Sequence, residues 1–342
     1  MLCTALGDWR AERASLSHGA DILVTTLSKL QAPRRSIVPP PHGLTRDRSP
    51  QAHLHPRTET PSLRADGVRA LVLDDAEAVY EAPSQLAGWR QLLQMVPDEC
   101  AVAMATPFIG RSLAAKAPAD VPGVEIVEGR GLHTTRPEVH TTVVRCSKGA
   151  YRGYASGYAG GYGSGTRGAL EALKVGALHE VMGYRLERRT VVVCNDNRGA
   201  EQVSEALRDR FAQLSPRRAP IVLGLHDGLS ATDRARALKV FLRPVGEGAQ
   251  QRPGPPRVLV ASARAVRGLE LGDAEPGCRR RPIEHIVLYD TPPHGGAYIR
   301  RLGLATRADR PPARVTILAT DGQIPFARAM LRHDTEGSTI SE

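Results

Sequence analysis

The sequence predicts an α/β protein built on parallel sheets. Short apolar runs rich in β-branched residues recur along the chain, and segments with helical periodicity separate them. Polar residues directly follow several of these runs. Parallel sheets bury such runs on both faces and collect the residues that follow them at one edge, where open α/β sheets bind ligands. The predicted strand ends are therefore the first places to look for function.

The length, net charge and cysteine content limit the classes of protein to which this chain can belong. A chain of 342 residues with 41% hydrophobic content has room for two cores. Its formal net charge of +10 favours a polyanionic partner such as RNA. The five cysteines are widely spaced and form no metal-type pair, so we expect a reducing intracellular compartment: cytoplasm, nucleus or mitochondrion. No apolar run reaches the roughly 18 residues of a membrane span, so we expect no membrane partner.

The first half of the chain places polar residues after three predicted strands. The strand within 19–30 ends near Thr26 and Lys29, and the strand at 68–73 ends in Asp74 and Asp75. Adjacent carboxylates at a strand end are how NTPases hold Mg²⁺ and position a water, although either aspartate could instead cap the following helix. The third strand, 100–105, is followed by Thr106. Between them, residues 31–66 show no periodicity and are interpreted as a disordered insertion.

The second half begins after a segment of low complexity, 147–168, rich in Gly and Tyr. We interpret it as a linker, with stacking of its tyrosines on unpaired bases as the alternative. Beyond it, helices and strands alternate. The expected strands are 190–194, 220–225, 257–262, 283–289 and 313–320; the expected helices are about 169–186, 199–213 and a segment ending at 241, with a frayed helix after 326.

These segments, in this order, resemble the motifs of DEAD-box RNA helicases. Asp-Asp-Ala-Glu at 74–77 resembles the family's Asp-Glu-Ala-Asp, and Met-Ala-Thr at 104–106 resembles its Ser-Ala-Thr. Residues 21–30, 195, 226–234, 262–271 and 298–307 resemble further motifs of the family. The resemblance covers 16–320 apart from two insertions and a linker. It implies two RecA-like parallel-sheet domains in tandem, the first N-terminally truncated.

The resemblance also implies a domain plan. A partial first domain would occupy 1–146, with the insertion at 31–66, and the linker 147–168 would join it to the second domain at 169–325. Residues 326–342 would be a tail. The family's first sheet is built around a phosphate-loop strand that this sequence does not show. Without that strand the first sheet would expose an apolar edge, which a protein partner could cover.

The resemblance also implies functional roles for individual residues of this sequence. Asp74 matches the Mg²⁺ ligand, Asp75 the residue that orients the attacking water, and Arg307 the arginine finger. Glu270 matches the ribose contact, so Glu270 and Arg307 would bind ATP. The matches to RNA-phosphate contacts are Thr26, Lys29, Arg234 and Ser262. Thr106 would couple the two domains, while Arg267 and Arg301 would brace loops within the second domain.

Several positions depart from the family's pattern. The phosphate loop requires a Gly-Lys step, and none of the five lysines follows a glycine. Asp75 stands where the family has Glu, Ala263 where motif V has Asp, and Arg300 where motif VI has His. Either the chain is a fragment, or it is a degenerate helicase.

We favour the degenerate helicase, because substitutions in the second domain do not follow from missing upstream sequence. The expected function is RNA binding or ribonucleoprotein assembly without ATPase activity. The alternatives are an ATP-dependent RNA helicase whose N-terminal ATP-binding segment is missing from this chain, with ATP and Mg²⁺ as cofactors, and a protein-binding scaffold without RNA contact.

Overall fold

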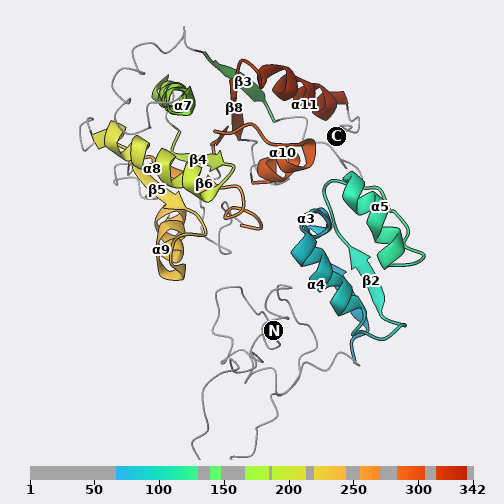
Figure 1. The fold of residues 1–342 in the computed structure, drawn as a ribbon. Helices are drawn as coiled ribbons and strands as arrows, with labels where there is room; N and C mark the ends of the chain where they lie inside the picture. The colour runs from blue at the N-terminus through green and yellow to red at the C-terminus, as the bar shows by residue number, and fades with distance from the viewer. Residues whose placement is uncertain are drawn as a thin grey trace, which may run out of the picture. The chain divides into compact units, whose positions relative to one another are not determined.

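The computed structural model describes residues 67–129, 139–147, 166–184, 187–212, 219–243, 255–269, 271, 283–304 and 313–336. It divides into two compact units, Met1–Ile126 and Val127–Glu342 (Figure 1). Four predicted site residues, Thr26, Lys29, Glu270 and Arg307, lie outside the described residues, as do the insertion 31–66 and most of the predicted linker.

In its described residues, 67–126, the first unit contains a pair of parallel strands with helices packed on one face. Its elements are β1 (Ala70–Leu73), α3 (Ala76–Glu81), α4 (Pro83–Leu93), β2 (Ala101–Met104) and α5 (Arg111–Asp120). β1 and β2 pair from Ala70 opposite Ala101 to Leu73 opposite Met104. Because side chains alternate along a strand, Leu71 and Leu73 face the helices while Val72 points away and is 68% exposed. The core of this unit therefore lies on one side of its sheet.

The second unit contains a six-stranded sheet in which every pairing is parallel. The strand order is β3-β8-β7-β4-β6-β5. The strands are β3 (Thr141–Cys146), β4 (Arg189–Cys194), β5 (Ile221–Leu225), β6 (Arg257–Ser262), β7 (His285–Leu288) and β8 (Arg314–Thr320). The helices are α7 (Thr166–Tyr184), α8 (Asn197–Ala212), α9 (Ala231–Leu242), α10 (Gly295–Leu302) and α11 (Ile324–Glu336). Every residue of β4, β6 and β7 is buried, as the uninterrupted apolar runs predict for central strands of a parallel sheet.

Helices cover both faces of this sheet. α7 and α8 supply Leu178 and Leu207 to a core that includes Val192 and Val260, so these helices lie on the face where those two side chains point. On the opposite face, α9 contacts β5 and β6, and α11 contacts β3 and β8. In Figure 1, α8 and α9 lie beside β5 and β6, and α11 lies beside β3 and β8. The parallel α/β architecture predicted from the sequence is confirmed.

Two predicted boundaries differ from the structure. The first domain was expected to end at residue 146. The structure instead has a strand that was not predicted, Thr141–Cys146 (β3), which pairs with β8 in the second unit. Its Val144 and Cys146 contribute to the same core as α7, so packing across the sheet decides where this strand belongs. The segment 147–168 therefore connects two elements of one unit, and its last three residues, 166–168, are already part of α7.

The predicted tail also begins inside an ordered element. α11 runs through Glu336, and its Ala327 and Met330 are fully buried. This helix packs on β3 and β8, so the second unit extends beyond residue 325. Among the described residues, no helix combines the length and apolar character needed to cross a membrane.

Candidate functional site

The carboxyl edge of the six-stranded sheet holds a polar network centred on Asp290, which lies two residues after the end of β7. Lys174 Nζ on α7 lies 2.8 Å from Asp290 Oδ1. The backbone N–H of Asn195, just after β4, donates to Asp290 Oδ2 at 2.9 Å. Arg301 Nη1 on α10 donates to the Asp290 carbonyl oxygen at 3.1 Å. Asp290 therefore contacts two helices, α7 and α10, and the residue that follows the neighbouring strand β4.

Arg301 is a buried arginine whose guanidinium is held by the strand ends. Only 6% of the residue is exposed, and Nη2 donates to Asn195 Oδ1 at 2.5 Å. Burial lowers the pKa of Arg301 to about 10, while the nearby Asp290 carboxylate opposes that shift. The prediction that Arg301 braces the second domain is confirmed by these contacts. A buried guanidinium in this position fixes the distance between β4, β7 and α10.

Lys174 has its charge shared between a carboxylate and an aromatic ring. Its ammonium lies 5.1 Å from the centroid of the Tyr289 ring, and the Tyr289 hydroxyl donates to Glu171 Oε2 at 2.8 Å. Cys194, at the end of β4, is also fully buried in this region, and desolvation raises its pKa well above the usual value. The thiol therefore stays protonated, and the network is built to hold structure rather than to supply a nucleophile.

A second cluster lies beyond the ends of β5 and β6 and is centred on Asp227. Arg234 Nη1 approaches Asp227 Oδ1 at 3.4 Å, and Arg264 Nε approaches Asp227 Oδ2 at 3.2 Å. The Arg264 side chain is 80% exposed, compared with 26% for Arg234. α9 begins beside this cluster, where Ser230 Oγ accepts from the Asp233 N–H at 3.1 Å and caps the helix. Two guanidinium groups share one carboxylate, so the cluster retains a net positive charge.

Ser262, predicted to contact an RNA phosphate, is fully buried. Its hydroxyl oxygen accepts from the Ala265 N–H at 3.3 Å, which stabilises the turn that follows β6. In this arrangement the hydroxyl has no exposed surface to offer a ligand, so the predicted contact differs from what the structure shows. The same turn carries Arg264, which is exposed. The polar residue at the strand end shapes the loop, and the arginine two positions later faces solvent.

In the first unit, Asp74 and Asp75 follow β1. Asp75 has a left-handed backbone, with φ of 49°, and its N–H donates to Asp74 Oδ1 at 3.0 Å. Aspartate tolerates this conformation better than most side chains because it can hydrogen-bond locally. Asp74 is exposed and supplies one carboxylate, which suits Mg²⁺ because that ion is held by one or two carboxylates together with nucleotide phosphates. No group of three or more His, Cys, Asp and Glu in the described part of the chain is arranged to hold a metal ion.

Thr106 and Glu77 connect the ends of β1 and β2. Thr106 Oγ1 lies 2.5 Å from Glu77 Oε2 and 2.7 Å from the Phe108 carbonyl oxygen. Glu77 is only 1% exposed, so its carboxylate is a buried acceptor. The Ala76 N–H donates to the Ala105 carbonyl oxygen at 3.0 Å and joins the same two strand ends. The structure thus brings Thr106 to the strand end that carries Asp74 and Asp75.

Sequence reasoning missed three residues of these clusters: Lys174, Asp290 and Arg264. No role was predicted for Asp290, although a carboxylate just after a predicted strand is a usable signal. Lys174 stands alone among apolar residues of a helix, which is also a recognisable departure from the pattern. The pairing of these residues is not visible in the sequence, since 116 positions separate Lys174 from Asp290.

Comparison with known proteins gives one consistent group of relatives. No family model matches the chain. It is 23% identical over 282 residues to DEAD-box ATP-dependent RNA helicase 50 of Oryza sativa subsp. japonica, which covers 82% of this chain and 39% of the rice protein. The Arabidopsis thaliana protein of the same name is 21% identical over 283 residues, 82% of this chain and 32% of that protein. The chain thus spans about a third of the length of these relatives.

Solved structures match the fold. S. cerevisiae Dbp5 bound to RNA and ADP BeF3 gives a TM-score of 0.62 at 14% identity, over 92% of this chain and 63% of that one. The DEAD-box helicase Mss116 bound to ssRNA and UDP-BeF gives 0.63 at 12% identity, over 98% of this chain and 56% of that one. Both matches agree with parallel-sheet units of the RecA-like type. In sequence this chain is similar to DEAD-box RNA helicases, and its fold is similar to that of solved DEAD-box structures.

Proposed function

We propose that this chain is an RNA-binding protein of the DEAD-box helicase type that acts in RNA binding or ribonucleoprotein assembly without hydrolysing ATP. The observation that carries the proposal is the Asp227 cluster, in which Arg234 and Arg264 share a single carboxylate. A net positive charge at the carboxyl edge of a parallel sheet suits the phosphates of a nucleic acid. Relatives of known structure, Dbp5 and Mss116, are described bound to RNA, which supports the same partner here.

In this proposal Arg264 and Arg234 contact RNA phosphates directly. Arg264 has the larger exposed surface, so it makes the stronger electrostatic contribution to a solvated ligand. Ser262 acts indirectly by holding the turn on which Arg264 stands. Thr26 and Lys29 are proposed as further phosphate contacts from the first unit. Thr106, hydrogen-bonded to Glu77, is proposed to couple that unit to the second.

Loss of hydrolysis is proposed from the residues that replace the family's catalytic ones. Asp75 has a shorter side chain than the glutamate it replaces, and a placement error of about an ångström can cost roughly a hundredfold in rate. Ala263 and Arg300 change two further positions of the nucleotide-binding motifs. Asp74, Glu270 and Arg307 match a metal ligand, a ribose contact and an arginine finger, and we propose that they are vestiges. When bound, ATP and Mg²⁺ would supply the phosphoryl group and its charge neutralisation.

The test is RNA binding measured by fluorescence anisotropy with a labelled oligouridine. Arg264→Glu is expected to weaken binding roughly tenfold and to reduce the slope of log K against log salt by about one. Arg236→Glu is the matched control, because Arg236 is also exposed, at 75%, and also pairs with one aspartate, Asp233. The control should lose much less affinity. Equal losses of RNA affinity in both variants would mean that binding depends on the overall charge of the chain and not on the Asp227 cluster.

The two alternatives are separated by companion measurements. ATP hydrolysis is measured by phosphate release with and without oligouridine, for this chain and for a version extended upstream to any in-frame start. RNA-stimulated hydrolysis by either protein would establish the helicase alternative. No RNA binding at low salt, or binding insensitive to salt, would instead favour a protein-binding scaffold.

A further inference from the structure

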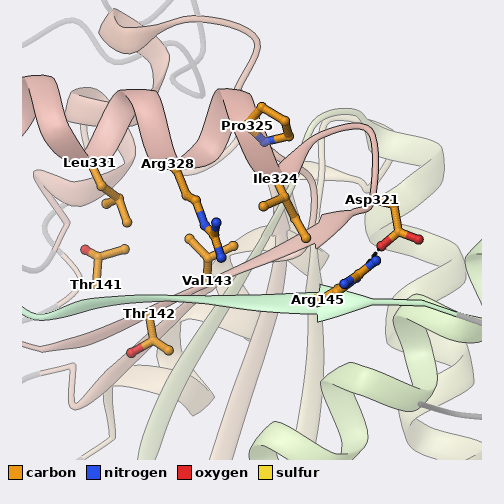
Figure 2. Close-up of a pocket in the computed structure, with 9 residues that line it drawn as sticks. All are labelled: Thr141, Thr142, Val143, Arg145, Asp321, Ile324, Pro325, Arg328 and Leu331. Atoms are coloured by element: carbon orange, nitrogen blue, oxygen red, sulfur yellow. Dashed lines mark hydrogen bonds and ion pairs between the residues drawn. The ribbon is translucent and has the colours of Figure 1, made fainter. Parts of the chain in front are cut away.

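A groove lies along β3 at the edge of the six-stranded sheet, away from the clusters described above. It has a volume of about 560 Å³ and lies between β3 and α11. Nine residues line it: Thr141, Thr142, Val143, Arg145, Asp321, Ile324, Pro325, Arg328 and Leu331. Figure 2 shows Ile324, Arg328 and Leu331 pointing from α11 toward the strand, while Thr141 and Val143 point back toward the helix.

β3 is an edge strand with one side available for pairing. Among the described residues it pairs only with β8, from Thr141 opposite Val315 to Cys146 opposite Thr320. The backbone N–H and C=O groups on its other side are therefore a template for another strand. Proteins use such edges to bind extended peptides, since the backbone ladder gives affinity and pockets for alternate side chains give selectivity. The six residues of β3 would accommodate a peptide strand of similar length.

The chemistry of the groove indicates which peptide would fit. Val143, Ile324 and Leu331 form an apolar lining, and Ile324, Arg328 and Leu331 share one face of α11 because they are spaced by four and three positions. Arg145 is neutralised by Asp321, with Nε 2.6 Å from Oδ1. Arg328 is exposed and has no hydrogen bond or ion pair with the described residues. One uncompensated positive charge therefore remains in an apolar groove.

We propose that the groove between β3 and α11 is a docking site for an extended peptide that adds a strand to β3. Its alternate side chains enter the groove, with apolar groups against Ile324 and Leu331 and an acidic group opposite Arg328. A protein segment fits better than RNA, because no aromatic side chain among the nine lining residues offers a stacking surface for bases. A second copy of this chain fits less well, since it would present another groove with the same net positive charge. This site would recruit a protein partner independently of the Asp227 cluster.

The test uses the full chain and the labelled peptide Thr-Val-Thr-Glu-Thr-Val-Thr, whose valines and glutamate share one face of a strand. A matched peptide carries Lys in place of Glu. Fluorescence anisotropy should show saturable binding, with the Glu peptide roughly fivefold tighter than the Lys peptide, as expected for exchanging an attractive for a repulsive exposed charge pair. Arg328→Glu should reverse this preference. N-methylation of the peptide's alternate backbone amides should abolish binding when the methylated groups are those that face β3.

Arg332→Glu is the control, because it makes the same charge change one helical turn later on α11, outside the groove lining. It should leave the preference for Glu unchanged, and circular dichroism should show both variants folded. Three outcomes would overturn the proposal. They are no saturable binding of the Glu peptide, an unchanged preference in Arg328→Glu, or a dimer seen by light scattering that excludes the peptide. Displacement of the peptide by oligouridine, with Arg328→Glu weakening only oligouridine, would make the groove an RNA surface instead.

Discussion

The two units use similar strand sequences and bury them to different extents. In the second unit, β4 and β6 are buried at every position, with helices on both faces of the sheet. In the first unit, β1 is buried only at Leu73, and Val72 in the middle of the strand is 68% exposed. An apolar β-branched run is therefore a sound predictor of a strand. How deeply that strand is buried depends on neighbours that the run itself does not specify.

Charged pairs in the two units differ in the same way. Lys174 and Asp290 have side chains 5% and 20% exposed. Arg90 and Asp120 in the first unit, at 2.8 Å, have side chains 48% and 9% exposed. Removing one member of a buried pair leaves an uncompensated charge, whereas an arginine that is half in water loses little when its partner changes. The difference predicts unequal responses to mutation in the two regions.

The largest expected effect is that of Lys174→Met. The variant keeps an apolar stem but leaves the Asp290 carboxylate without its cation, which should destabilise the second unit by about 3–5 kcal/mol. The contrasting change in the first unit, Asp120→Asn, leaves behind an arginine that is half in water and should cost less than about 1 kcal/mol. Hydrogen exchange with peptide-level resolution during urea unfolding measures both units in one sample. If the two variants cost the same, burial is not what separates these pairs.

A smaller contrast is expected for apolar truncations. Leu259 on β6 is fully buried, so Leu259→Ala should cost about 2–5 kcal/mol through lost burial and the cavity that remains. Val72→Ala removes an exposed side chain and should change stability by no more than about 0.5 kcal/mol. The same exchange experiment reports both values. A large loss of stability in Val72→Ala would mean that the Val72 side chain is covered in solution. That result would support the prediction that a protein partner covers this sheet.

Taken per unit of pH, the smallest expected effect in the second unit is a dependence of its stability on pH. His285 on β7 is fully buried, its Nδ1 accepts from Arg314 Nη2 at 3.2 Å, and Nε2 lies 2.9 Å from Thr316 Oγ1. Burial, with a smaller contribution from Arg314, lowers its pKa to about 3 from the usual 6.5. The folded state thus prefers neutral histidine. This stabilisation is complete above about pH 6.5 and is lost as the pH falls toward 3, with a slope of at most ~1.4 kcal/mol per pH unit.

His285→Leu should flatten that part of the pH profile, measured by urea unfolding at a series of pH values. His179, whose pKa is also lowered by burial, remains in the variant and accounts for part of any residual slope. The described part of the first unit contains no histidine. Its stability should therefore not fall over this pH range through histidine protonation. If the dependence of stability on pH is unchanged in His285→Leu, a group other than His285 is responsible for it.

Much of the site was visible in the sequence because strand ends are local features. The runs that became β1, β4 and β6 place Asp74, Asn195 and Ser262 at or just after the ends of parallel strands, and the motif order indicated the family that the chain resembles. Asp290 lies just after β7 in the same way, but no role was predicted for it. The direction of individual side chains was not visible. Ser262 points inward while Arg264 points outward, because a turn after β6 decides which of them meets solvent.

By itself the sequence determined the fold class, the positions of the described strands other than β3, and the residue types at their ends, because apolar period and turn chemistry act over a few neighbouring residues. Only the tertiary structure decided that β3 joins the second unit, that α11 completes its core, and that Lys174 neutralises Asp290. Those outcomes depend on contacts between residues far apart in the chain. Such contacts are selected by packing the whole sheet, and no local pattern encodes them.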